Sequence, residues 1–248
     1  MTDELSFLKC RIDDIVSSVK LDGKPKILGF LSENEIAFAK LLLRNDTGYT
    51  FFGGFENAER QMLAVYPKDL ELSNNAFPIT PIRFTYIKNA GLTHRDFLGA
   101  FMSLKIERKT VGDISVFDGV CYTVATKEAA KLILSEVNKV KNVGVKSQIC
   151  EFADLQKPEN TKIQIRFTVT SNRLDAVVSS ITHLSRERAK DLIISGEVFV
   201  NSLEVNKYVK PLTGGDKITI RGYGKYAVEN CDEISKKGKI IFNISKYI

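Results

Sequence analysis

The stretch GDISVFDGVCYTVAT (residues 112–126) constrains the fold more than any other part of the chain. Two runs of β-branched and aromatic residues flank Asp118-Gly119 in this stretch. Asp-Gly between two such runs is a strong short-range signal for a two-residue β-hairpin. The sequence therefore predicts two antiparallel strands joined by a tight turn.

The elements expected around this hairpin complete a recognisable order. A strand is expected in PITPIRFTYIK (78–88), a helix capped by Thr93 in 93–104, a helix capped by Thr126 in 126–140 and a last strand in 143–152. The order βαββαβ predicts a ferredoxin-like middle domain over residues 79–152. RNA-recognition modules share this order, but their aromatic strand signature is absent from the sequence. Contact between this sheet and RNA therefore stays open.

The N-terminal region, residues 1–78, is expected to be a small, mostly helical domain. Apolar residues recur at helical spacing in DELSFLKCRIDDIVSSVK (3–20). Ser32 followed three residues later by Glu35 has the spacing of a capping box. Gly53-Gly54 interrupts the pattern, and residues 58–64 fit either a helix or a strand.

The chain beyond the middle domain has two predicted parts. Residues 153–161 are polar and contain Pro158, so they are expected to form a linker, and residues 162–248 a C-terminal domain. This domain opens with a strand and continues with a helix from Leu174 to Ser180, capped by Ser171 or Asn172. A second helix is expected from Arg186 to Ser195, capped by Ser185 and ended by Gly196. The predicted fold class is α+β.

Charge is unevenly distributed along the chain. Residues 1–78 carry 9 basic and 12 acidic residues, whereas residues 79–150 carry 11 and 6. Residues 151–161 carry 1 and 3, and residues 162–248 carry 15 and 9. Two basic segments beside an acidic one point to a polyanionic partner.

The second C-terminal helix places basic residues where a helix alone does not favour them. Arg186 and Arg188 lie in its first turn, next to the positive end of the helix dipole. An anion bound there would meet the helix amides and the guanidinium groups together. A solvated basic helix face is the alternative interpretation, and spacing alone leaves both open.

The C-terminal domain resembles the S4 RNA-binding domain. The matching stretches are RLD (173–175), SRERAKDLIISGEVFVN (185–201), VKPLTGGDKITIRG (209–222) and the following YGKY. The resemblance implies that the face formed by the two helices holds folded RNA, chiefly through Arg173 and Arg186. The turn that is often Asn-Gly in this family is Asn201-Ser202 here, which is expected to be less tight.

The whole chain resembles the YlmH family of bacterial S4 proteins. FFGGFENAERQM (51–62) and HRDFLGAFMSLKIERKTVGDI (94–114) carry this resemblance, although Lys105 stands where glycine is expected. The family implies binding to large-subunit ribosomal RNA and peptidyl-tRNA in ribosome-associated quality control. In that process, a stalled nascent chain is extended without mRNA after the ribosomal subunits separate.

The expected RNA-binding residues are nine polar or basic side chains of the C-terminal domain. They are Arg173, Ser185, Arg186, Arg188, Lys190, Asn201, Lys210, Arg221 and Lys225. The cations would contact phosphates, and Ser185 and Asn201 would donate to the RNA backbone or 2′-hydroxyl groups. If roughly 4–6 phosphates are neutralised, the log–log salt dependence of binding should have a slope of about −3 to −5.

No catalytic residue, cofactor or metal site is expected. The four cysteines form no CxxC pair and there are only two histidines, so reduced thiols in a cytoplasmic protein are expected. HRD (94–96) lacks the other protein-kinase motifs. Neither a secretory signal nor a membrane helix is expected, and the chain should be a monomer off the ribosome.

Two other functions stay open. One is an RNA-modifying enzyme or its targeting subunit, of the pseudouridine synthase or methyltransferase type, because S4 domains often deliver such enzymes to RNA. The motifs that such enzymes need are not found in residues 1–160. The other is a protein adaptor that works through the acidic N-terminal segment.

Overall fold

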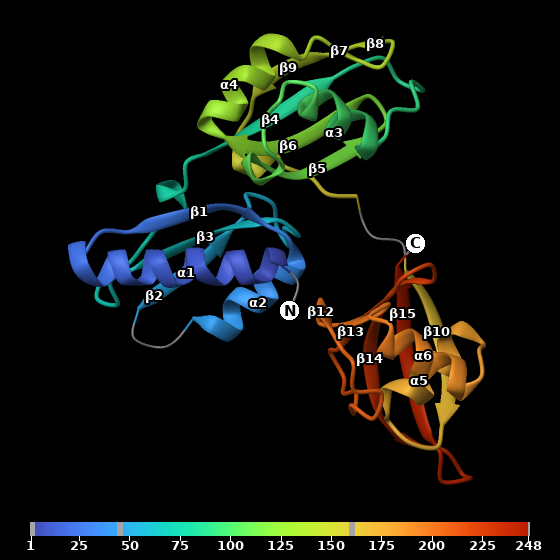
Figure 1. Cartoon of the computed structure of the whole chain (residues 1–248). Coiled ribbons are helices and arrows are strands. Elements are labelled where there is room, and N and C mark those ends of the chain that lie inside the picture. The colour runs from blue at the N-terminus through green and yellow to red at the C-terminus, as the bar shows by residue number, and fades with distance from the viewer. Residues whose placement is uncertain (1–2, 44–46, 159–161, 248) are drawn as a thin grey trace. The chain divides into compact units, whose positions relative to one another are not determined.

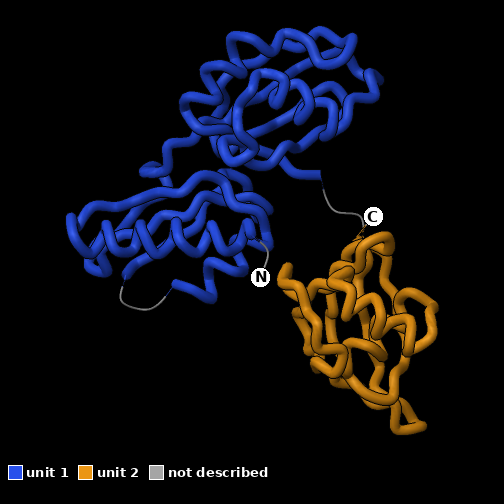
Figure 2. The backbone as a smooth tube through the Cα atoms, in the orientation of Figure 1, with its two compact units in different colours: residues 1–158 blue, residues 159–248 orange. Residues whose placement is uncertain are grey.

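The computed structural model describes residues 3–43, 47–158 and 162–247. The chain forms two compact units, residues 1–158 and residues 159–248 (Figure 2). Both contain helices and antiparallel sheets, which confirms the predicted α+β class. Of the proposed linker 153–161, residues 159–161 lie outside the described part of the chain.

The N-terminal part of the first unit packs two helices on a three-stranded sheet. Its elements are α1 (Asp3–Asp22), β1 (Lys26–Leu31), α2 (Glu33–Leu42), β2 (Gly48–Phe52) and β3 (Gln61–Tyr66), with strand order β1-β3-β2. The capping box of Ser32 and Glu35 is confirmed. The expectation of a mostly helical region missed this sheet, because short apolar runs such as KILGFL carry no period that separates strand from helix.

The middle part has the predicted order of elements. These are β4 (Ile79–Thr85), α3 (His94–Met102), β5 (Val111–Phe117), β6 (Val120–Thr126), α4 (Lys127–Glu136) and β9 (Lys146–Ile149). The sheet has strand order β5-β6-β4-β9, and β7 (Lys139–Val140) and β8 (Val143–Gly144) form a separate hairpin. Short 3-10 helices lie at Asn74–Ala76, Arg108–Thr110 and Phe152–Asp154. The hairpin at Asp118-Gly119 and the N-caps Thr93 and Thr126 are confirmed.

The two faces of this sheet pack against different partners. On one face, Phe84 and Cys121 pack against residues of α3 and α4, such as Phe97 and Ile133. On the opposite face, a second cluster joins the sheet to the N-terminal part; its buried members include Phe30, Met62, Ala64, Ile79, Tyr122 and Val124. The sheet of the middle part is therefore covered on both faces around Tyr122.

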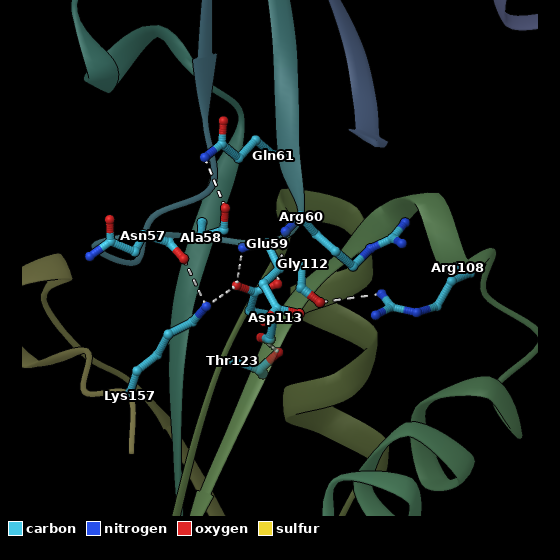
Figure 3. A network of polar contacts seen from close by, with 10 residues as sticks. All are labelled: Asn57, Ala58, Glu59, Arg60, Gln61, Arg108, Gly112, Asp113, Thr123 and Lys157. Carbon is cyan, nitrogen blue, oxygen red and sulfur yellow. Dashed lines mark hydrogen bonds and ion pairs between the residues drawn. The ribbon is translucent and has the colours of Figure 1, made fainter. Parts of the chain in front are cut away.

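Asp113 anchors this junction through polar contacts (Figure 3). Its carboxylate is 8% exposed and accepts hydrogen bonds from the backbone N–H groups of Glu59 (2.8 Å) and Arg60 (2.9 Å). Lys157 pairs with the same carboxylate at 2.7 Å and donates to the carbonyl of Asn57 at 3.0 Å. Close approach is also required at Gly112, where an added Cβ would lie 2.7 Å from the ring of Phe30. One buried carboxylate thus joins the 57–60 loop, β5 and the segment after β9.

The second unit is a six-stranded sheet with two helices. Its elements are β10 (Lys162–Val169), α5 (Leu174–Thr182), α6 (Arg186–Ile194), β11 (Val198–Val200), β12 (Leu203–Glu204), β13 (Lys217–Ile220), β14 (Gly224–Ile234) and β15 (Ile240–Tyr247). The strand order is β10-β15-β14-β13-β11-β12. Leu174 and Val177 of α5 and Ile193 of α6 pack with Phe242 and Ile244 in one core. This packing fixes both helices on the sheet.

Candidate nucleic-acid interface

The centre of the two-helix face is a buried carboxylate. Asp175 is the second residue of α5, and its side chain is 0% exposed. Arg173 donates to it from Nη2 (2.9 Å) and Nε (3.2 Å), and Arg186 of α6 donates from Nη2 (2.9 Å). A buried charge needs such partners, because desolvation without them would be costly.

The two arginines decide the ionisation of Asp175. Burial raises the pKa of this carboxyl, but the hydrogen bonds from Arg186 and Arg173 outweigh that effect and hold the pKa below its ordinary value. The side chains of Arg173 and Arg186 remain 38% and 45% exposed. Each guanidinium has five N–H donors. Both arginines can therefore hold Asp175 and still offer donors to a ligand.

Tyr208 brings a third cation to the same place. Its ring lies 5.1 Å from Nζ of Lys190 and 5.7 Å from the guanidinium carbon of Arg173. Its backbone carbonyl accepts a hydrogen bond from the N–H of Asp175 at 3.0 Å. We call Arg173, Asp175, Arg186, Lys190 and Tyr208 the Asp175 cluster. Its three cations and one buried anion leave a net positive surface.

The expected cap of α5 is wrong. The N-cap is Arg173, rather than Ser171 or Asn172, and it makes no side-chain cap hydrogen bond. The amide of Asn172 donates to the carbonyl of Leu212 instead. The first helical N–H groups are satisfied by backbone carbonyls, since Leu174 N–H donates to Lys210 at 2.8 Å and Asp175 N–H to Tyr208. The backbone of Lys210 thus supports the helix start, while its partly exposed side chain stays a candidate contact.

The predicted cap of α6 is confirmed. Ser185 is its N-cap and accepts a hydrogen bond from the N–H of Arg188 at 3.2 Å. Arg188 is exposed. The anion that Arg186 meets is Asp175, an acid of the chain itself. The unfavourable position of Arg186 in the first helical turn therefore has an internal explanation as well as a ligand-based one.

Asn201 and its turn differ from expectation. Asn201 donates to Asp216 at 2.7 Å and accepts from the N–H of Lys217 at 2.9 Å, so its amide is used inside the domain. Asn201 and Ser202 both have left-handed φ, 52° and 65°, and Val200 pairs with Leu203 across them. These are features of a tight two-residue hairpin turn. The expected loosening of the turn is wrong.

Two expected residues lie on or next to strands of the sheet rather than on the two helices. Arg221 follows β13 and contacts Glu197 at 3.7 Å, and its guanidinium lies 5.3 Å from the ring centre of Phe199. Lys225 is exposed on β14, opposite Thr219 in the ladder. The structure thus gathers Arg173, Arg186 and Lys190 in one cluster, whereas Arg221 has partners outside it.

Sequence reasoning missed the two residues that organise the cluster. Asp175 is an acid between apolar residues at the start of α5, and such a position signals a buried, paired charge. Tyr208 lies in an irregular segment between β12 and β13, and no sequence signal connects it with Lys190.

Comparisons with known proteins match the middle of the chain to a family model and most of the chain to one curated relative. Residues 73–154 match the family model described as "Putative RNA-binding domain in YlmH". The chain is also 27% identical over 217 residues to "Ribosome-associated protein quality control protein P2" of Bacillus subtilis (strain 168), covering 86% of this chain and 84% of that protein. The resemblance to the YlmH family is confirmed.

A solved YlmH structure shares the fold. "Cell division protein ylmH from Streptococcus pneumoniae" superposes with a TM-score of 0.56 at 17% identity. The match covers 62% of this chain and 95% of that one. At this identity the comparison supports the fold alone.

The part that matches the YlmH RNA-binding domain has little free aromatic surface on its sheet. RNA-recognition modules stack bases on aromatic residues of an open sheet face. Here Tyr122, in the middle of the face opposite the helices, is 6% exposed and packs in the cluster shared with the N-terminal part. Tyr122 is thus unavailable for stacking while the two parts stay packed.

The cysteines of this YlmH-like chain, Cys10, Cys121, Cys150 and Cys231, are free thiols. Within residues 3–43, 47–158 and 162–247, no group of His, Cys, Asp or Glu side chains could hold a metal ion. No helix in the described part of the chain has the length and apolar character needed to cross a membrane.

Proposed function

We propose that this protein is a cytoplasmic, non-catalytic RNA-binding factor that acts on the large ribosomal subunit in ribosome-associated quality control. In this proposal, the C-terminal unit is an S4 RNA-binding domain, and the middle part has a ferredoxin-like fold. The Asp175 cluster carries the proposal: Arg173, the N-cap of α5, and two cations of α6, Arg186 and Lys190, come together on one partly exposed surface.

The geometry favours phosphate binding over base reading. Guanidinium groups bind phosphate oxygens with charge-assisted hydrogen bonds, and such contacts position a protein without reading sequence. Arg173 and Arg186 each keep donors free while Asp175 holds them. The partner would be structured RNA, with large-subunit rRNA and peptidyl-tRNA as the proposed examples. The relative from Bacillus subtilis, named for ribosome-associated quality control, supports this setting.

A binding role also fits the chemistry of the cluster. A general base needs a proton-accepting group with a pKa near the working pH. Asp175 has a lowered pKa and two guanidinium partners, so it is a poor proton acceptor. We therefore propose that the cluster holds RNA and performs no chemical step. The alternative, an RNA-modifying enzyme or its targeting subunit, predicts a modified nucleotide that disappears from a deletion strain.

The direct test measures binding of the full chain to purified large subunits and to tRNA over a range of salt concentrations. Arg188→Gln and Lys190→Gln should each weaken binding and reduce the log–log salt slope by about 0.7–0.9 for each phosphate that is no longer neutralised. Lys9→Gln is the matched control, because Lys9 pairs with Asp13 at 3.0 Å on α1. A wild-type slope near zero would refute the proposal.

Arg186→Glu is a poor test of the same proposal. A carboxylate at position 186 would face the buried Asp175, whose side chain is 0% exposed. Two adjacent carboxylates would destabilise the domain, so weaker binding would not report on RNA contact. Arg186→Gln avoids this charge reversal and is the better variant at that position.

A further inference from the structure

The turn between β14 and β15 carries a concentrated positive charge. We call Ser235–Lys239 the lysine turn; Lys236, Lys237 and Lys239 are all exposed in it. None of the three forms an ion pair with another residue that the structure describes. The preceding acid, Glu233, is already paired with Arg166 at 3.0 Å. The turn therefore presents three unneutralised cations within four residues.

The backbone of the lysine turn is fixed by its own hydrogen bonds. Ser235 N–H donates to the carbonyl of Lys239 at 2.7 Å, and Gly238 N–H to the carbonyl of Ser235 at 2.9 Å. The Ser235 hydroxyl accepts from Lys239 N–H at 3.0 Å, and Gly238 supplies a left-handed φ of 70°. Ile234 and Ile240 pair directly below the turn. A preorganised backbone lowers the entropic cost of binding a ligand.

The lysine side chains have no part in this architecture. The turn is closed by backbone groups, by the hydroxyl of Ser235 and by Gly238. Three neighbouring like charges repel one another, so they destabilise the compact state rather than support it. Lysines that are only solvated need no fixed backbone. The backbone of the lysine turn is fixed, because the turn closes the antiparallel pair of β14 and β15.

The lysine turn lies at the same end of the sheet as the Asp175 cluster. Ile240, next to Lys239, pairs with Val169, the last residue of β10. Arg173 follows Val169 by four residues, which span at most about 14 Å. Figure 1 shows the turn beyond the end of β10, near the chain that leads into α5. One structured RNA could contact both places.

We propose that Lys236, Lys237 and Lys239 form a second contact with the RNA backbone, which extends the surface of the Asp175 cluster. The inference rests on the proposed function and adds a contact surface to it. The ligand chemistry is a row of phosphodiesters, because ammonium groups act as point charges toward phosphate and read no base. The turn thereby enlarges the footprint on RNA without adding sequence preference.

The test compares three full-length proteins: wild type, the triple variant Lys236→Gln, Lys237→Gln, Lys239→Gln, and the triple variant with arginine at the same positions. Binding to purified large subunits and to tRNA is measured between roughly 50 and 300 mM salt, where phosphate contacts are strongly salt-dependent. In the glutamine variant, the slope of log affinity against log salt concentration should be smaller in magnitude by about 2–3. Its affinity should be at least roughly tenfold lower than that of wild type. The arginine variant should bind like wild type. Neither variant should unfold at a lower temperature than wild type, because the lysine side chains do not support the turn.

The outcomes separate this inference from the proposed function. If the glutamine variant keeps the wild-type slope and affinity while Arg188→Gln weakens binding, the lysine turn is not an RNA contact and the proposed function stands. If wild type shows no salt-dependent binding to either RNA, both fail. If wild type binds phosphatidylglycerol vesicles and the glutamine variant does not, while both bind RNA equally, the turn contacts a membrane surface and the inference is overturned.

Discussion

Arg186 in α6 donates to Asp175 in α5 across 2.9 Å, eleven residues away in the sequence. Arg173 donates to the same oxygen, also at 2.9 Å. The carboxylate therefore holds the two helices together and sets the directions of both guanidinium groups. Because Asp175 is buried, the proposed function makes it a positioning residue, and the arginines would contact the ligand.

Asp175→Asn should separate the positioning role from simple folding. The amide keeps the size of the side chain but loses the charge-assisted hydrogen bonds, so unfolding free energy should fall by about 1–3 kcal/mol. RNA affinity should also fall under conditions where the variant is fully folded, because the arginines lose their fixed directions. Chemical denaturation and the salt-dependent binding assay measure the two effects. Wild-type affinity in a folded variant would contradict the positioning role.

The lowered pKa of Asp175 gives a pH dependence with a defined sign. The folded state favours the ionised carboxylate, so the stability it contributes is present above the unfolded value of about 3.9. This stability is lost as pH falls through the lower, folded pKa. The difference in unfolding free energy between wild type and Asp175→Asn should thus be constant from pH 7 to about 5 and shrink below about 4. A difference that grows on acidification would mean that the pKa is raised.

The sequence predicted the regular elements of the middle part and the first strand and two helices of the C-terminal part well, because hairpin and capping signals are local. It made no prediction for the strands β12 to β15. Asp118-Gly119, Thr126 and Ser185 all act where the sequence places them. The sequence could not predict contacts between distant segments. The caps of α5 come from the carbonyls of Tyr208 and Lys210, and a residue thirty or more positions away leaves no local signal.

Two positions where the family resemblances expect glycine also show what the sequence alone does not reveal. Lys105 stands where the family resemblance predicts glycine, and its φ is 60°. Ser202 replaces the glycine of an Asn-Gly turn and has a φ of 65°. The family resemblance thus identified two positions where glycine is usual, and the structure shows that both keep a left-handed backbone without glycine.

The junction around Asp113 predicts a strong effect on the stability of the first unit. Asp113→Asn replaces one acceptor oxygen by an N–H₂ group that would face the N–H of Glu59 or Arg60, so the first unit should lose about 1–3 kcal/mol of stability. Amide hydrogen exchange in residues 57–60 should accelerate. Glu107→Gln is the control: its carboxylate is 67% exposed and pairs with Lys109 on the surface, so the change should be within about 0.5 kcal/mol.

Ser202→Gly should stabilise the second unit. A non-glycine residue in the left-handed region costs roughly 1–2 kcal/mol, whereas glycine adopts it freely and loses about 0.4–1 kcal/mol through the entropy of the unfolded chain. The net gain should be up to about 1 kcal/mol in chemical denaturation, with RNA affinity unchanged. Ser195→Gly is the matched control, because Ser195 has a φ of −76° and its hydroxyl donates to Leu192 at 3.2 Å. That change should destabilise the domain, and equal effects of the two substitutions would show that backbone strain at position 202 is not the cause.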